Sequence, residues 1–269
     1  MYEKKIKNKE SAGIFSLTHL TPGAGTYIGK LHFSEAAELV FVERGGFAVN
    51  LCGRLEVIGE GSIAFIDPYL LHSIEEAEPY PEYSVYLIEM SHELYAEAEK
   101  IRRDLLPSIF RIEPQGIRVL TALIEWGMSL GGRMSADMRR GFAALFFGAM
   151  RGMELRAQRT VIKRTPFSVG LVRYIGEHFA EDISLDQLAD RFGYEKTYLS
   201  RMIGGVLGMN LREYLNRMRV CAAIEMKNKN PGIPMYRIAE TCGFGSENTF
   251  YRSMRNYNRG EFEKIDEIN

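Results

Sequence analysis

The sequence has 269 residues, of which 46% are hydrophobic and 26% charged, and its formal net charge is -1. This balance is typical of a globular chain of about two domains and excludes collagen-like or disordered protein. Cys52, Cys221 and Cys242 are odd in number and far apart, so no disulfide framework or cysteine metal site is expected. Because the N-terminus is charged and no long apolar run is present, we expect neither a signal peptide nor a membrane span. We therefore expect a cytoplasmic protein with no membrane contact.

Residues 1–110 are expected to form a β-rich domain. Short runs rich in Val, Ile and Phe, bounded by Gly, Pro and Asp, are typical of strands. Such runs cover residues 38–46, 47–51, 62–68 and 83–90. Several short strands at this spacing favour a sandwich or a small barrel.

Residues 111–160 are expected to form a helical linker. From Pro114 to Arg159 apolar residues recur at three- and four-residue spacing, which indicates helix. Two glycines at 131–132 interrupt the pattern, and Ser135 is placed to cap a second helix. The pair carries more apolar surface than one amphipathic face needs. Phe142 and Phe146 could therefore be core or could pair two protomers, and we favour a homodimer.

Residues 166–269 contain one pattern twice. In the first copy, about 184–205, a capping residue begins a helix that ends at Gly193, and a second helix follows within a few residues. In the second copy, about 234–256, Ala239 and Gly243 repeat the spacing of Ala189 and Gly193. Two helices joined by a short turn containing glycine predict a helix-turn-helix, whose second helix enters the DNA major groove.

The second helix of each copy begins with side chains that can read base edges. Asparagine can pair with adenine, arginine with guanine, and threonine can contact the thymine methyl. Between Arg191 and Arg255 there are eleven Lys or Arg and five Glu, an excess whose sign suits phosphate. A bundle of unrelated function would also contain capping residues and glycines, but it would not repeat them in order.

Residues 167–262 resemble the DNA-binding region of the AraC/XylS family of transcription regulators. The resemblance is carried by "ISLDQLADRFGYEKTYLSRM", by "GMNLREYLNRMRVCAAIEM" and by "IPMYRIAETCGFGSENTFYRSMRNY". It implies two helix-turn-helix units joined by one long helix, which read adjacent major grooves about 34 Å apart. By position, the implied DNA-contacting residues are Thr197, Ser200, Arg201, Glu247, Asn248, Thr249 and Arg252. The family's usual basic residue after the first recognition helix is here Gly204.

The β-rich domain resembles a cupin, the small barrel that members of this family carry as a sensor. His32, Glu38 and His72 stand at three of four metal-ligand positions, and Ser34 replaces the fourth. Two histidines and a carboxylate can hold iron, but sensor cupins keep such remnants without metal. We therefore expect an effector pocket for a small organic molecule that includes His32, Glu38, Tyr69 and His72, with no metal and no cofactor.

The expected architecture is α+β and multidomain: a cupin-like β-barrel, a helical linker, and an all-α domain with two helix-turn-helix motifs. The function that fits is a cytoplasmic DNA-binding transcription regulator controlled by an effector, with RNA polymerase as a further partner if it is an activator. Two alternatives remain open at this point. One is a metal-dependent cupin enzyme with a helical appendage, and the other is a regulator whose sensor binds a protein.

Overall fold

The computed structural model describes residues 4–8, 15–22, 31–77, 80–91, 94, 109–154, 156–159 and 165–266. They group into two compact units. The first unit contains the chain up to residue 164 except for a short segment, Gly29–Phe33. That segment belongs to the second unit, together with the chain from Thr165 onward.

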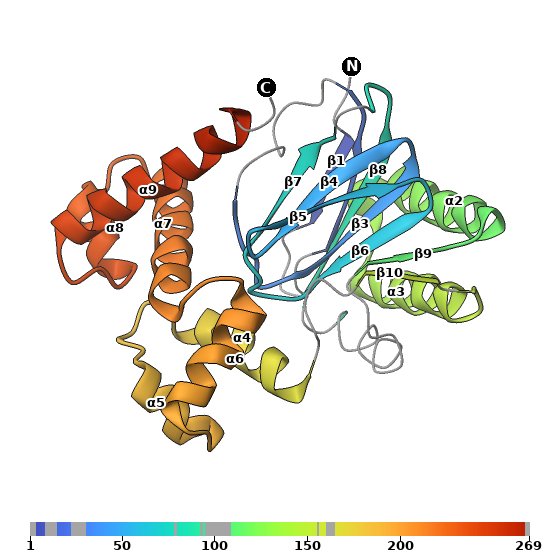
Figure 1. Ribbon diagram of the computed structural model, residues 1–269. Helices are drawn as coiled ribbons and strands as arrows, with labels where there is room; N and C mark the ends of the chain where they lie inside the picture. Colours follow the sequence, from blue (N-terminus) through green and yellow to red (C-terminus); the bar gives the residue numbers. More distant parts are fainter. Residues whose placement is uncertain are drawn as a thin grey trace. The chain divides into compact units, whose positions relative to one another are not determined.

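Two antiparallel sheets make the β part of the first unit (Figure 1). The larger has the order β1 (Lys4–Asn8), β2 (Phe15–Leu20), β8 (Ser84–Met90), β3 (Ala37–Arg44), β6 (Ser62–Ile66), β9 (Ile109–Arg111) and β10 (Arg156–Arg159). The smaller has the order β5 (Arg54–Gly59), β4 (Gly46–Leu51) and β7 (His72–Glu76). The expected β-rich domain is confirmed, while a closed barrel stays a prediction.

Two helices follow the strands. α2 (Pro114–Leu130) and α3 (Ala136–Arg151) are separated by the short 3-10 helix η1 (Gly131–Arg133). The hydroxyl of Ser135 accepts a hydrogen bond from the N–H of Met138 and so caps α3, as expected. The helical prediction is wrong at its end, because α3 stops at Arg151 and residues 156–159 pair with β9.

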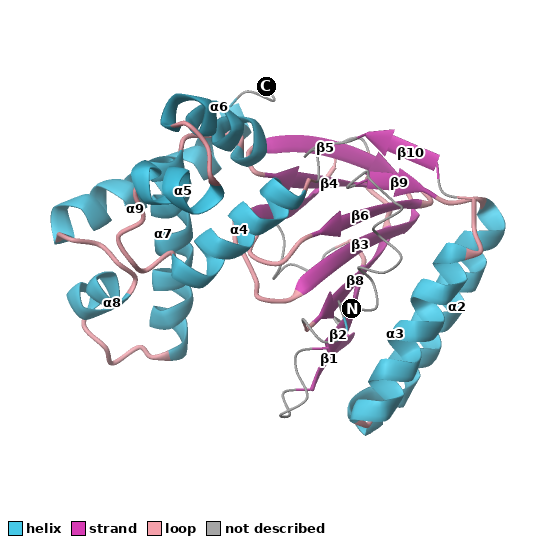
Figure 2. Cartoon of the chain, turned by 90° about the horizontal axis from the view of Figure 1, so that it is seen from below, coloured by secondary structure: helices cyan, strands magenta, loops and turns pink. Residues whose placement is uncertain are grey.

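The core of the first unit lies between the larger sheet and the helical pair α2 and α3. The two helices run side by side (Figure 2). Leu39, Phe41 and Ile88 of the sheet share one buried cluster with residues of both helices. Phe142 packs edge-on against Phe15 with 5.5 Å between ring centroids. The helical residues of this cluster are Leu120, Ile124, Met128, Phe142, Ala143, Phe146, Phe147 and Met150.

This packing corrects one expectation. Phe142 and Phe146, considered as residues that could face a second protomer, are 3% and 1% exposed within the chain itself. Burying a phenylalanine side chain stabilises a fold by about 1.5–3 kcal/mol, so these rings contribute to the first unit's own stability. Periodicity placed these two rings on an apolar face of the helix but did not indicate what covers that face.

The second unit is all-α. Its helices are α4 (Pro166–His178), α5 (Leu185–Phe192), α6 (Lys196–Leu207), α7 (Leu211–Lys229), α8 (Met235–Thr241) and α9 (Glu247–Asp266). Pro166 opens α4, as its fixed φ favours at a first helical position. α7 joins the two helix pairs α5–α6 and α8–α9. In the described part of the chain, no helix combines the length and apolar composition of a membrane span.

The short segment Leu31–Phe33 contributes to this second unit although it comes from the N-terminal part of the sequence. The carbonyl of Leu31 accepts hydrogen bonds from the Cys221 thiol at 3.2 Å and from the Tyr257 hydroxyl at 2.9 Å. The Phe33 ring packs edge-on against the Phe179 ring, with centroids 5.4 Å apart. One short stretch of extended chain therefore contacts α7, α9 and the end of α4.

Candidate nucleic-acid interface and effector site

The first helix-turn-helix is formed by α5 and α6. Ser184 and Gln187 make a reciprocal capping box at the start of α5, as expected from their spacing. Gly193 ends the helix with φ +69°, in the left-handed region that favours glycine. Leu188 and Leu199 are fully buried between the two helices, and Ala189 is 8% exposed. The second helix is therefore held by its apolar face and leaves its polar face outward.

The second helix-turn-helix is formed by α8 and α9. Its turn contains Gly243 at φ +88°, and Ser246 accepts a hydrogen bond from the N–H of Thr249 at 3.3 Å. Ile238, Ala239 and Phe250 are at most 2% exposed, and together with residues of α7 they form one core. Both predicted copies thus fold as helix–turn–helix, with a left-handed glycine in the turn and the same small residue, Ala189 or Ala239, in the first helix.

The side chains implied as DNA contacts lie mainly outside these cores. In α6 they are exposed, and in α9 only Thr249 is half-buried. The hydroxyl of Thr249 lies 3.0 Å from the Ser246 hydroxyl, so it is engaged in the cap of α9. The exposed implied contacts are Thr197, Ser200, Arg201, Glu247, Asn248 and Arg252.

The sequence reasoning missed the cap of the first recognition helix. Both carboxylate oxygens of Glu195 accept hydrogen bonds, from the N–H groups of Thr197 and Tyr198, each at 2.9 Å. These bonds, aided by the nearby Arg201 guanidinium, lower the pKa of the Glu195 carboxyl. The arrangement is a normal N-cap, but glutamate is not among the preferred capping residues, so local composition gave little signal.

Exposed tyrosines were also missed. Tyr198 on α6 and Tyr251 on α9 are 50% and 47% exposed, and each follows the N-terminus of a second helix. A hydroxyl on a rigid ring can hydrogen-bond to a phosphate oxygen, and tyrosine is one of the residue types that make such contacts. These two side chains extend the polar face that the arginines provide.

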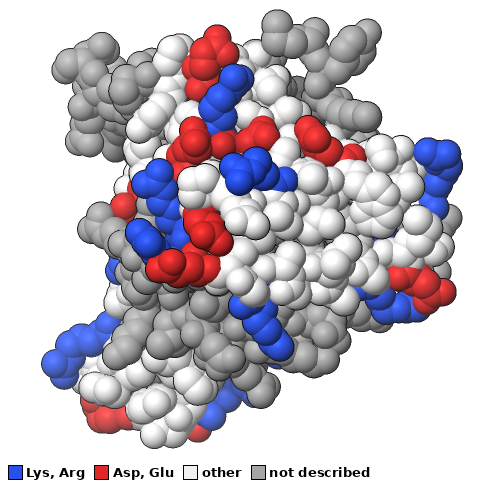
Figure 3. All heavy atoms as spheres, turned by 90° about the vertical axis from the view of Figure 1, so that its right-hand side faces the viewer, with Lys and Arg blue, Asp and Glu red and all other residues white. Residues whose placement is uncertain are grey.

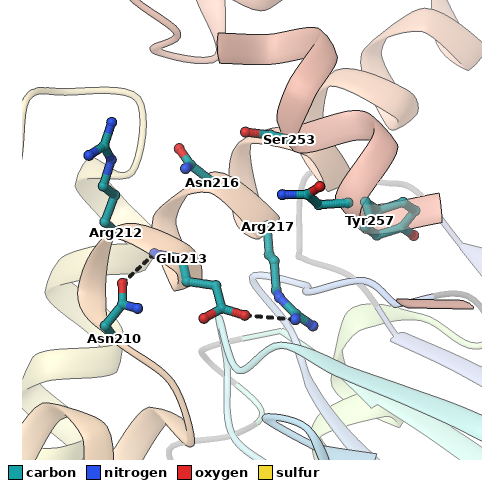
Figure 4. Close-up of a pocket in the computed structure, with 8 residues that line it drawn as sticks. Asn210, Arg212, Glu213, Asn216, Arg217, Ser253 and Tyr257 are labelled. Atoms are coloured by element: carbon teal, nitrogen blue, oxygen red, sulfur yellow. Dashed lines mark hydrogen bonds and ion pairs between the residues drawn. The ribbon is translucent and has the colours of Figure 1, made fainter. Parts of the chain in front are cut away.

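A pocket of about 320 Å³ lies between α7 and α9 (Figure 4). Asn210 caps α7 by accepting from the Glu213 N–H, and Glu213 pairs with Arg217 at 2.8 Å. The lining is polar and consists of Asn210, Arg212, Glu213, Asn216, Arg217, Ser253, Asn256 and Tyr257. Since the ion pair lies within one helix and at the surface, its contribution is that of an ordinary i,i+4 pair.

In the first unit, two of the expected effector residues meet. Glu38 of β3 and His72 of β7 come from different sheets, and the His72 Nε2 lies 3.2 Å from the Glu38 carboxylate. His72 Nδ1 lies 2.8 Å from the Leu70 carbonyl, which orients the ring. Both side chains are buried, at 5% and 1% exposure. A carboxylate and an imidazole so placed can bind a polar ligand or serve as two metal ligands.

Tyr69 and His32 are the other two expected effector residues. Tyr69 adopts φ +64°, which is unusual for a residue other than glycine, and its N–H donates to the Ser34 carbonyl at 2.7 Å. It therefore fixes the turn before β7. His32 lies in the segment 31–33 that belongs to the second unit.

Two polar residues that the sequence did not indicate lie in one cross-strand row with Glu38. Ser16, Glu89 and Glu38 stand directly opposite one another across β2, β8 and β3, so they share one face of the larger sheet. The Ser16 hydroxyl donates a hydrogen bond to the Glu89 carboxylate. Like charges opposite each other in a sheet are destabilising. A row with two carboxylates, one of them the buried Glu38, is therefore a candidate binding feature.

Comparison with known proteins agrees with this geometry. Residues 188–259 match the family model of a helix-turn-helix domain. The regulatory protein SoxS of Salmonella typhimurium is 35% identical over 86 residues, which are 32% of this chain and 78% of SoxS. The chain belongs to the AraC/XylS family of transcription regulators. As a member of that family, it is a DNA-binding transcription regulator.

Similarity extends beyond the DNA-binding part of this AraC-family chain. The HTH-type transcriptional activator RhaS of Escherichia fergusonii is 26% identical over 237 residues, 81% of each chain. Among solved structures, unsaturated fatty acid bound ToxT of Vibrio cholerae has a TM-score of 0.54 at 14% identity, covering 96% of this chain and 94% of ToxT. The shared fold has a β-rich N-terminal domain and a helical C-terminal domain. Because the relatives are regulators, the regulator hypothesis is confirmed over the enzyme hypothesis.

Proposed function

We propose that this regulator binds two successive major-groove segments of duplex DNA with α6 and α9. The supporting observation is the repeated position of an exposed arginine, Arg201 on α6 and Arg252 on α9, one helical turn inside each recognition helix. Arginine pairs bidentately with guanine, while Asn248 can pair with adenine. Other basic side chains of α6 and α9 would contact phosphate.

The direct test is to sequence the genomic fragments that the purified full-length protein retains. An Arg201→Ala, Arg252→Ala double variant serves as the control, because both side chains are exposed and their loss leaves the cores intact. We expect one enriched sequence with the wild type and loss of that enrichment with the double variant. Equal enrichment by both proteins, or none by either, would contradict the proposal.

The β-rich domain, residues 1–110, is proposed to be a cupin-like sensor for a small organic effector. His32, Glu38, Tyr69 and His72 are its proposed pocket residues, and Glu89 joins them through its place in the row with Glu38. Carboxylates accept hydrogen bonds and repel anions. The effector is therefore proposed to be a neutral, hydroxyl-rich molecule or a cation. No metal is required for binding to DNA.

Ligands that raise the melting temperature of the full chain can be used to test the pocket. We expect hits that stabilise the wild type but not Glu38→Gln or His72→Ala. The first variant removes the charge of the buried pair at nearly the same shape, and the second removes the imidazole. A matched control is Glu56→Gln, which removes a partly exposed carboxylate of β5. Stabilisation of all variants by the same ligand would place the effector elsewhere. Stoichiometric metal in the wild type, lost in His32→Ala, would overturn the metal-free reading.

Residues 111–160 are proposed to pair two protomers through the outer faces of α2 and α3. Four large apolar side chains there are exposed: Val119 at 39%, Trp126 at 47%, Met138 at 37% and Leu145 at 52%. Figure 3 shows a broad area without charged side chains on the side of the molecule where these helices lie. We further propose that the dimer acts in the cytoplasm as a transcriptional activator that contacts RNA polymerase. The similar protein RhaS is named a transcriptional activator, which supports this proposal.

A further inference from the structure

The loop between α4 and α5 is held by one arginine of the linking helix. On α7, Arg219 donates from Nε to the Phe179 carbonyl and from Nη2 to the Glu181 carbonyl, each at 2.7 Å. The planar fork of a guanidinium matches two carbonyls at this separation, and bonds from a charged donor are stronger than neutral ones. Burial lowers the pKa of Arg219, and the nearby Asp182 opposes that shift.

The same loop contacts the turn of the second helix-turn-helix. A Cβ atom added to Gly243 would lie 2.3 Å from the Ala180 carbonyl oxygen and 2.7 Å from the carbonyl carbon. Any side chain at this position would therefore require the backbone to move. Ala180 is the residue between the two whose carbonyls bind Arg219. Three consecutive residues, Phe179 to Glu181, thus join α4, the linking helix α7 and the turn before α9.

Both recognition helices are connected closely to this junction. α9 begins at Glu247, four residues after Gly243. α5 is held against α4 by aromatic packing of Phe192 on Phe167, with 5.4 Å between ring centroids, and α6 follows α5 after a short turn. A change at the junction would therefore change the distance and angle between α6 and α9.

We propose that Arg219 is a positioning residue that fixes which spacing between the two DNA segments the regulator accepts. The inference rests on the proposed binding of both segments by one chain. One DNA turn of about 10.5 base pairs spans about 34–36 Å, so one added base pair moves the second segment by about 3.4 Å and rotates it by about 34°. A rigid pair of helices rejects that change, whereas a loosened junction accepts it.

Arg217 provides a matched control on the same helix. It lies two residues before Arg219, and its guanidinium pairs with Glu213 on the wall of the α7–α9 pocket (Figure 4). Arg217→Gln removes the same charge from α7 as Arg219→Gln does, but it leaves both bonds to the α4–α5 loop in place. A difference between the two variants therefore reports the junction and not the net charge.

The experiment uses the full-length protein and duplexes made from the enriched site, with one base pair removed or added between the two footprinted segments. Affinity is measured by fluorescence anisotropy. The ratio of affinities for native and altered spacing is the readout, because general loss of stability would lower both affinities together. Arg219→Lys is included, since its ammonium can reach one carbonyl and keeps the charge.

We expect the wild type and Arg217→Gln to bind DNA of altered spacing about tenfold or more weakly than DNA of native spacing. That factor corresponds to the loss of one charged hydrogen bond to a base or phosphate. In Arg219→Gln that ratio is expected to fall to about threefold or less, with Arg219→Lys between. A folded Arg219→Gln with the wild-type ratio would overturn the inference. If Arg219→Gln does not fold, a wild-type ratio in Arg219→Lys overturns it equally. Failure of the wild type to bind any site would instead overturn the proposed function, and this inference with it.

Discussion

Gly193 and Gly243 hold the same left-handed backbone conformation in the two helix-turn-helix turns, at φ +69° and +88°, but only Gly243 is in contact with another backbone. Apart from its own chain neighbours, a Cβ atom on Gly193 would meet no heavy atom within 4 Å in the described part of the chain, whereas one on Gly243 would collide with Ala180. The two copies of the repeat are therefore not equivalent. The second turn is part of the junction between the motifs.

This difference predicts unequal costs for the same substitution. Gly193→Ala should lower the free energy of unfolding by about 1–2 kcal/mol, the cost of a side chain in the left-handed region. Gly243→Ala should cost more, because strain and collision add. Thermal or urea unfolding followed by far-UV circular dichroism measures both. Equal midpoints would show that the loop at Ala180 moves aside freely.

Arg252→Ala should weaken binding to the enriched site by about 1–3 kcal/mol, the value of a bidentate base contact. Arg237→Ala is the matched control, since Arg237 is an exposed arginine on α8 that lies beside Tyr236. A gel-shift titration compares them. If Arg252→Ala binds as tightly as Arg237→Ala, Arg252 does not read a base.

Gly204→Lys should tighten binding to all duplex DNA, because it restores a cation at the position where the family usually has one. The site has room, since a Cβ atom there meets nothing within 4 Å. One added phosphate contact should steepen the plot of log affinity against log salt by about 0.9. Gly205→Lys, one residue along the same helix, is the control. The same slope change in both variants would indicate a general effect of charge.

Glu195→Ala should destabilise α6 at neutral pH but not in acid. The pKa of Glu195 is lowered in the folded chain by its backbone hydrogen bonds. Its stabilising contribution is therefore full above its ordinary unfolded value, about 4.3, and is lost as pH falls through the lower folded value. Melting curves of wild type and variant should differ at pH 7 and converge as the acid range is entered. A difference that grows in acid would mean that the carboxylate is not the cap.

Trp126→Glu with Leu145→Glu should give a folded monomer, because both side chains are about half exposed in the single chain. Phe142→Glu should instead unfold the first unit, since it would bury a charge in the core. Sedimentation velocity and circular dichroism of the three proteins separate these outcomes. A wild type that sediments as a monomer would remove the proposed dimer.

The sequence predicted best what depends on neighbours along the chain. The capping box of Ser184 and Gln187, the cap at Ser135 and the glycine turns are all local arrangements, and the structure has each of them. The repeated helix-turn-helix pattern then indicated the AraC/XylS family. Glutamate at the cap of α6 was missed because its side chain is an uncommon capping group.

Features that depend on distant pairing could not be predicted in the same way. Ser16 and Glu89 become neighbours only through the register of β2 and β8. The strands β5 and β7 are only six and five residues long, too few to establish a period of two from the sequence. Apolar periodicity in α3 was real, but it cannot tell a sheet of the same chain from a second protomer.

The segment Leu31–Phe33 has a consequence for how the protein can be divided. Because it completes the helical unit, a fragment that starts at residue 165 lacks the carbonyl that accepts from Cys221 and Tyr257 and the ring that packs on Phe179. The Cys221 thiol is buried in the whole chain. The rate at which the Cys221 thiol is alkylated therefore reports how often the intact protein releases this segment. The alkylation rate of the fragment, which lacks the segment, gives the upper limit.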